Sequence, residues 1–232
     1  SASVSEHRTA DAGSLPLKGK LAAIFGRQDA LQFFYIAVVM GVGFGLIESY
    51  LFLLLTDMGA PEMLLGLSLT VTCIAEVPVF QLLTWMMSKL GGPDGLLNIC
   101  LGAYVLRMLI YAQLPRLGSP YWVLPVECLH GLTFGAGWGA GCEKSKALAP
   151  PGLEATQQGV FQGLYFGLGY GLGSLVGGVL ADEYGYQTMY LLGALIVSVL
   201  WACGVAWHMV LSRRSRGAEA LRYASVPPVD QG

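Results

Sequence analysis

The chain has 232 residues, of which 54% are hydrophobic and 12% are charged, and its formal net charge at pH 7 is −2. Soluble domains carry about 25% charged residues, so this composition excludes an ordinary soluble domain and indicates a membrane protein with several spans. The net charge says nothing about nucleic acid, but the sequence has no basic stripe interleaved with aromatic residues, so we expect no nucleic-acid partner. We expect the lipid bilayer to be the main partner.

The chain divides into a polar N-terminal segment (1–30), a transmembrane bundle (31–210), and a C-terminal tail (211–232) that is basic and then polar. Within the bundle, apolar stretches are long enough to cross about 30 Å of hydrocarbon. Short connections that contain Gly, Pro or Asp separate them. The sequence therefore predicts an all-α membrane protein with six transmembrane helices, at residues 31–56, 63–87, 95–114, 121–142, 156–180 and 187–210.

The distribution of Lys and Arg predicts the orientation, because positively charged loops stay on the cytoplasmic side. Arg107 lies inside a span and Arg116 lies on one side of the bundle. Both termini are therefore expected on the other, cytoplasmic (or stromal or matrix) side of an unspecified membrane. That side carries the remaining basic residues: Arg8, Lys18, Lys20, Arg27, Lys89, Lys144, Lys146, Arg213, Arg214, Arg216 and Arg222.

Five ionisable residues lie inside predicted spans, where such groups are rare and usually face a polar interior. Glu48, Glu76 and Arg107 lie in the first, second and third spans. Glu127 and His130 lie in the fourth span, three residues apart, and so share one helix face. We expect these five residues to bind a small organic solute and protons.

The chemistry of Arg107 requires a partner, because a guanidinium does not lose its proton and is costly to bury alone. Glu48, Glu76 and Glu127 outnumber it. The excess carboxyl groups, with His130, provide the exchangeable protons that a proton-coupled carrier needs. The alternative is a static set of buried ion pairs that fixes the register of the helices.

Aromatic residues accompany these groups. Tyr104 and Tyr111 lie on the helix face of Arg107, and Phe134 and Trp138 continue the face of His130 in steps of four. Such rings either line a cavity for an organic solute or pack the bundle.

The predicted fifth span contains two rows of glycines with a four-residue spacing. Steps of four fall on one helix face, and in lipid such flat strips allow neighbouring helices into backbone contact. The helix either packs tightly or slides against its neighbours. The first row, to which we assign the helix packing, is Gly159, Gly163, Gly167 and Gly171; the second is Gly169, Gly173 and Gly177.

Sequence signals for catalysis are missing: there is no zinc-protease, nucleophile-elbow or phosphate-loop motif. The spacing of Cys128, His130 and Cys142 is not that of a metal site. We therefore expect neither an enzyme nor a cofactor or metal.

The turns after the second and fifth spans are similar, at residues 89–94 and 180–185. Because the two turns are three spans apart, they lie on opposite faces of the membrane. This arrangement is typical of the 3+3 inverted repeats of secondary transporters. Residues 89–91 also resemble a cytoplasmic loop motif of the major facilitator superfamily, and residues 148–185 resemble its helix eleven with flanks. Together these stretches resemble the second half of such a transporter.

Within that superfamily, residues 130–138 (His-Gly-Leu-Thr-Phe-Gly-Ala-Gly-Trp) resemble the helix-ten sequence of one group of proteins. This group includes the major facilitator superfamily domain-containing protein 6. The group is similar to lactose-permease-type symporters, which carry an acid, an arginine and a His/acid pair on successive helices. Glu76, Arg107 and the pair Glu127/His130 match these residue types, although here the acid comes first. The resemblance implies proton-coupled movement of a small organic solute.

The length of the chain differs from that of a complete family member, which has twelve spans and holds its substrate between two halves. The resemblance therefore implies that a second six-helix half or other membrane subunits complete the site. The chain is then a fragment, a half-carrier that pairs with another half, or a structural membrane subunit without transport.

Overall fold

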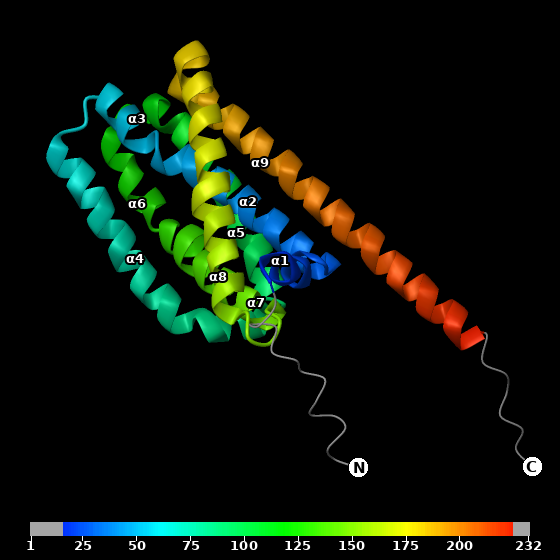
Figure 1. Ribbon diagram of the computed structural model, residues 1–232. Helices are drawn as coiled ribbons and strands as arrows, with labels where there is room; N and C mark the ends of the chain where they lie inside the picture. Colours follow the sequence, from blue (N-terminus) through cyan, green and yellow to red (C-terminus); the bar gives the residue numbers. More distant parts are fainter. Residues whose placement is uncertain (1–15, 225–232) are drawn as a thin grey trace, which may run out of the picture.

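The computed structural model describes residues 16–224, with side chains up to residue 213, and every element in this part is helical (Figure 1). The all-α prediction is confirmed. The α-helices are α1 (Leu17–Phe25), α2 (Gln28–Glu48), α3 (Leu51–Asp57), α4 (Glu62–Lys89), α5 (Gly92–Gln113), α6 (Val123–Glu127), α7 (Gly137–Leu148), α8 (Glu154–Gln162) and α9 (Tyr170–Ala224). Two 3₁₀ turns, η3 (Leu114–Leu117) and η4 (Pro120–Trp122), and two π-helices, η5 (Gly131–Ala136) and η6 (Gly163–Gly169), connect them.

Four helical stretches in the described part are long and apolar enough to cross a membrane: Gln28–Asp57, Glu62–Lys89, Gly92–Leu117 and Glu154–Arg213. The last has 60 residues, which at 1.5 Å per residue is about three times the hydrocarbon thickness. It is not straight, because Gly185 has the non-helical angles φ 75° and ψ 164°. The chain therefore turns back at the predicted connection between the fifth and sixth spans, as the yellow and orange arms show (Figure 1).

The stretch predicted as one helix at residues 121–142 is divided into η4, α6, η5 and α7. Pro125 has no amide hydrogen for the helical ladder, and the glycines of residues 131–137 allow the wider π-helical turn. The predicted first span is also interrupted, at Ser49 and Tyr50, directly after Glu48. Both interruptions lie beside candidate site residues.

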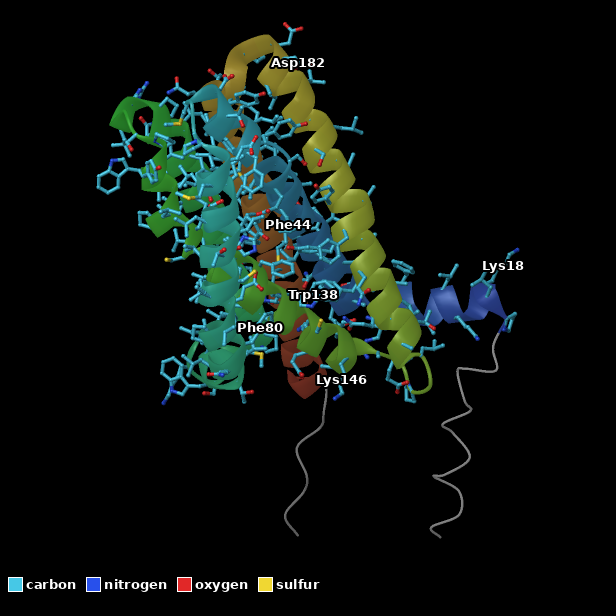
Figure 2. The ribbon with its side chains drawn as sticks, turned by 90° about the vertical axis from the view of Figure 1, so that its left-hand side faces the viewer. Lys18, Phe44, Phe80, Trp138, Lys146 and Asp182 are labelled. Carbon is cyan, nitrogen blue, oxygen red and sulfur yellow. The ribbon has the colours of Figure 1, made fainter. Side chains whose placement is uncertain are left out.

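The two ends of the bundle carry different parts of the chain: Lys146 lies at one end and Asp182 at the other (Figure 2). Within the N-terminal segment, α1 runs across the long axis of the bundle (Figure 2). The tail predicted from residue 211 begins as a continuation of α9, which ends at Ala224. Residues 1–15 and 225–232, and the side chains of Arg214, Arg216 and Arg222, lie outside the described structure.

Helix α2 forms the centre of the core and packs against α9 and η6 through glycines. A Cβ atom at Gly173 would lie 2.3 Å from the carbonyl oxygen of Val42, and one at Gly45 would lie 2.3 Å from that of Tyr170. A Cβ atom at Gly169 would likewise lie 2.6 Å from the carbonyl oxygen of Val38. Only glycine permits this approach, so the two backbones are in direct contact.

Within the described chain, the close contact is made by the second glycine row. A Cβ atom at Gly159, Gly163, Gly167 or Gly171 would meet no heavy atom of the described chain within 4 Å. The two rows are offset by two residues, or about 200° around a helix, so they occupy opposite faces. Spacing reveals both rows, but only packing decides which one meets α2.

Candidate substrate and proton site in the bundle interior

Arg107 lies at the centre of the site, on α5, and is completely buried. Its Nη2 atom lies 3.3 and 3.2 Å from the two carboxylate oxygens of Glu127. Its Nε atom donates to the hydroxyl of Tyr111 at 2.9 Å, and its Nη1 atom donates to the hydroxyl of Thr133 at 2.8 Å. The prediction that Arg107 requires a carboxylate partner is confirmed, and the partner is Glu127.

Tyr111 closes this arrangement, because its hydroxyl accepts from Arg107 and donates to Glu127. Glu127 is almost as buried as Arg107, with 3% of its side chain exposed. A buried charge pair is stable only when further hydrogen bonds satisfy both partners. Tyr111 and Thr133 provide these bonds, and we call these four residues the arginine network: Arg107, Tyr111, Glu127 and Thr133.

His130 lies next to this network and connects it to two further acids. Its Nε2 atom lies 3.1 Å from Glu76 on α4, and its Nδ1 atom lies 3.4 Å from Glu48 at the end of α2. The same Nδ1 atom lies 3.3 Å from Nη1 of Arg107. The structure therefore brings together all five ionisable residues that the sequence analysis selected, and we call His130, Glu48 and Glu76 the histidine group.

The Nδ1 atom of His130 has a different neighbour in each protonation state. When the ring is neutral and Nε2 carries the proton, Nδ1 accepts from Arg107 and Nε2–H donates to Glu76. The Oε1 atom of Glu48 is then buried without a hydrogen-bond partner among the described residues. When the ring is protonated, Nδ1–H donates to Glu48 instead. One proton therefore exchanges Arg107 for Glu48 as the partner of Nδ1, while Glu76 keeps its contact with Nε2.

Close backbone packing places Glu76 beside His130. Gly131 lies directly against α4, where a Cβ atom would come within 2.5 Å of the carbonyl oxygen of Ala75. Gly135 faces Glu76 itself, one π-helical turn further along. These glycines let η5 approach α4 closely enough for the histidine ring and the carboxylate to meet.

Aromatic rings extend from the histidine group toward α7 and η6. Phe44 is their centre, with ring centroids 5.4 Å from Phe134, 5.8 Å from Phe166 and 5.7 Å from Tyr170. Phe134 lies 6.3 Å from Trp138. Phe44 and Trp138 lie between α4 and the helical run from α8 into α9 (Figure 2). Two predicted residues, Phe134 and Trp138, thus belong to this aromatic cluster.

The other predicted aromatic residues have separate places. Tyr111 belongs to the arginine network, whereas the hydroxyl of Tyr104 lies 2.9 Å from that of Tyr165 and has no contact with Arg107 among the described hydrogen bonds.

The sequence analysis did not identify Thr133 as a hydrogen-bond partner of Arg107. Its position three residues after His130, on the same helical face, was the available signal.

The fold and site define an integral membrane protein with a buried, mixed-charge centre. A family model described as the MFS_1 like family matches residues 3–192. The chain belongs to this family, within the major facilitator superfamily.

Three relatives share the printed name major facilitator superfamily domain-containing protein 6-like. The protein from Danio rerio is 24% identical over 197 residues, which cover 84% of this chain and 36% of that protein. The protein from Mus musculus is 29% identical over 181 residues, which cover 78% and 30%. The protein from Homo sapiens is 25% identical over 189 residues, which cover 82% and 31%.

The chain thus spans about a third of the length of these relatives. No solved structure matches it.

Proposed function

We propose that this chain is the C-terminal six-helix half of a secondary transporter and that it couples the movement of a small organic solute to protons. The observation that supports the proposal most directly is the position of His130 between Glu48, Glu76 and Arg107, at 3.1 to 3.4 Å. Histidine changes its charge near neutral pH. Here that change alters the contacts of Arg107 on α5 and Glu48 at the end of α2.

The two parts of the site have different roles in this proposal. The arginine network is buried and satisfied, so it holds α5 and the α6–η5 region in a fixed relation. The histidine group is more accessible: 27% of the Glu48 side chain and 21% of the Glu76 side chain are exposed. We therefore assign the binding of solute and proton to Glu48, Glu76 and His130. Arg107 and Glu127 hold these three residues in position.

A second half completes the site in this proposal. The bend at Gly185 and the segmented stretch at residues 120–148 support six crossings arranged as a 3+3 inverted repeat, with both termini on the cytoplasmic, stromal or matrix side. The row from Gly159 to Gly171 has open space beside it in the described chain. This space supports the proposal that a helix from outside this chain packs there, because flat glycine strips favour helix contacts in lipid.

Uptake by proteoliposomes tests the transport proposal. The native protein that contains this chain is reconstituted, and uptake from a mixture of labelled organic solutes is measured with and without a pH gradient. We expect His130→Gln and Glu76→Gln to abolish the stimulation by the gradient. The matched control is Glu62→Gln, at the exposed start of α4. Uptake that is the same with and without the pH gradient, and the same in both variants as in the wild type, would contradict a role for protons in the mechanism.

A second candidate function is a structural membrane subunit without transport. The closed hydrogen bonding of the arginine network favours it, since such networks also serve only to fix helix register. Extraction in a mild detergent followed by mass measurement of the native complex separates the candidates. A stable assembly with several different subunits and no uptake activity supports the structural role.

A further inference from the structure

We infer that the histidine group binds an organic cation, an amine or quaternary ammonium on an apolar or aromatic body, in competition with the proton on His130. This inference rests on the proposed transport function for the movement of the cation. The binding itself can be tested separately. It follows from the charges, their exposure and the rings around them.

The charges of the site do not balance. Glu48, Glu76 and Glu127 provide three carboxylates, and Arg107 is the permanent cation within reach of them. Arg107 is paired with Glu127. With a neutral His130, Glu48 and Glu76 therefore lack a permanent positive partner, and unpaired charge is costly away from water.

The unbalanced carboxylates are also the accessible ones. Glu48 and Glu76 are 27% and 21% exposed, whereas Arg107 and Glu127 are 0% and 3% exposed. An anionic solute would meet two carboxylates first and could not reach the guanidinium. A cationic solute meets the two carboxylates that lack a permanent positive partner, and one of them, Glu48, has a buried oxygen without a hydrogen bond among the described residues.

Aromatic rings next to these acids suit the body of such a cation. Phe134 lies 5.5 Å from the ring of His130, and Phe44 lies 6.5 Å from it. Phe166, which contacts Phe44, is 40% exposed. The faces of aromatic rings attract ammonium groups, and their surfaces pack against apolar groups.

Proton and cation compete because they use the same two carboxylates. The charged groups that face His130 are Glu48 from α2, Glu76 from α4 and Arg107 from α5, with Glu127 behind Arg107. Tyr165 of η6, which is uncharged at neutral pH, lies beyond Phe44. Protonation of His130 reduces the negative charge of the group by one and occupies Glu48 and Glu76. Solute and proton therefore cross in opposite directions, which differs from the symport that the resemblance implies.

Binding to the native protein in lipid nanodiscs tests the inference. The probes are benzyltrimethylammonium, its uncharged isostere neopentylbenzene, and the anion phenylacetate, each measured by displacement of radiolabelled benzyltrimethylammonium and by direct calorimetry. We expect the cation to bind at least about tenfold more tightly than either other probe. Full competition weakens its binding by up to about tenfold for each pH unit below the pKa of the competing group.

Variants separate the site from the fold. Glu76→Gln and Glu48→Gln should each weaken binding of the cation about tenfold or more, while Glu76→Asp retains most of it. Glu62→Gln is the matched control and should bind like the wild type. Equal or tighter binding of the neutral or anionic probe, no binding of any probe, or unchanged affinity in Glu76→Gln would each overturn the inference.

The outcome for transport is distinguishable from the outcome for binding. Cation binding without uptake by proteoliposomes contradicts the transport function and leaves the cation site intact. Gradient-driven uptake of an uncharged solute, by a protein that does not bind the cation, contradicts the cation site and leaves the transport function intact. Uptake of the cation driven by a proton gradient of opposite direction supports both.

Discussion

The arginine network and the histidine group lie side by side, yet they differ in burial and in hydrogen bonding. In the first, Arg107 and Glu127 are buried and each has several partners. In the second, Glu48 and Glu76 are partly exposed and share one histidine. The two glycine rows repeat the contrast, since a Cβ atom at Gly173 would collide with the backbone of α2, whereas one at Gly167 would meet no other segment of the described chain within 4 Å. The groups with a full set of partners lie in the packed interior, and the groups with fewer partners are those for which we propose binding.

The largest effect is expected from removal of the guanidinium. Arg107→Met leaves Glu127 buried without its charge partner, and breaking such a pair costs about 3–5 kcal/mol. Thermal unfolding in detergent, followed by tryptophan fluorescence, should show a strongly destabilised or unfolded protein. The double variant Arg107→Met with Glu127→Gln should recover part of the loss. A stable single variant would mean that the network does not hold the helices.

The glycine rows offer a matched pair of substitutions. Gly173→Ala places a methyl group against the backbone of Val42, and overpacking of this kind costs about 1–3 kcal/mol. Gly167→Ala enters open space in this chain and should be neutral or slightly stabilising, because alanine favours the helix. The measurement is the difference in unfolding temperature between the two variants of the isolated chain. Equal losses would contradict the assignment of the α2 contact to the second row.

A functional effect without a large structural one is expected at His130. His130→Gln keeps a hydrogen-bonding side chain of similar length but cannot gain a charge. Stability should change by less than about 1 kcal/mol, since the ring contributes to no fully buried ion pair. The dependence of solute binding or uptake on pH should disappear. A retained pH profile would assign the titration to another group.

The smallest effect is expected at the surface pair of Lys144 and Asp94, whose charged atoms lie 2.6 Å apart. Asp94 is 63% exposed, and exposed pairs contribute about 0–1 kcal/mol. Lys144→Met should therefore change the unfolding temperature only slightly, and less still in high salt. A loss as large as that of Arg107→Met would show that distance, and not burial, sets the strength of these pairs.

Part of the site was predictable because membrane chemistry restricts it so strongly. An ionised residue in an apolar span has to meet a partner or water, so Glu48, Glu76, Arg107, Glu127 and His130 were expected to converge, and they do. Which acid pairs with Arg107 was not predictable. It depends on how α5 and α6 are rotated and spaced relative to one another, which contacts between segments far apart in the chain decide. In the same way, Gly131 and Gly135 let η5 approach α4 and so place Glu76 beside His130.

The sequence by itself determined the class of protein, the apolar segments, the turn at Gly185 and the set of charged residues, because hydrophobicity and backbone chemistry are local properties. Only the tertiary structure decided that Glu127, and not Glu48 or Glu76, pairs with Arg107, and that Gly169, Gly173 and Gly177 face α2. Each of these depends on the rotation and spacing of helices around one another. Packing between distant segments sets these quantities, and no local pattern encodes them.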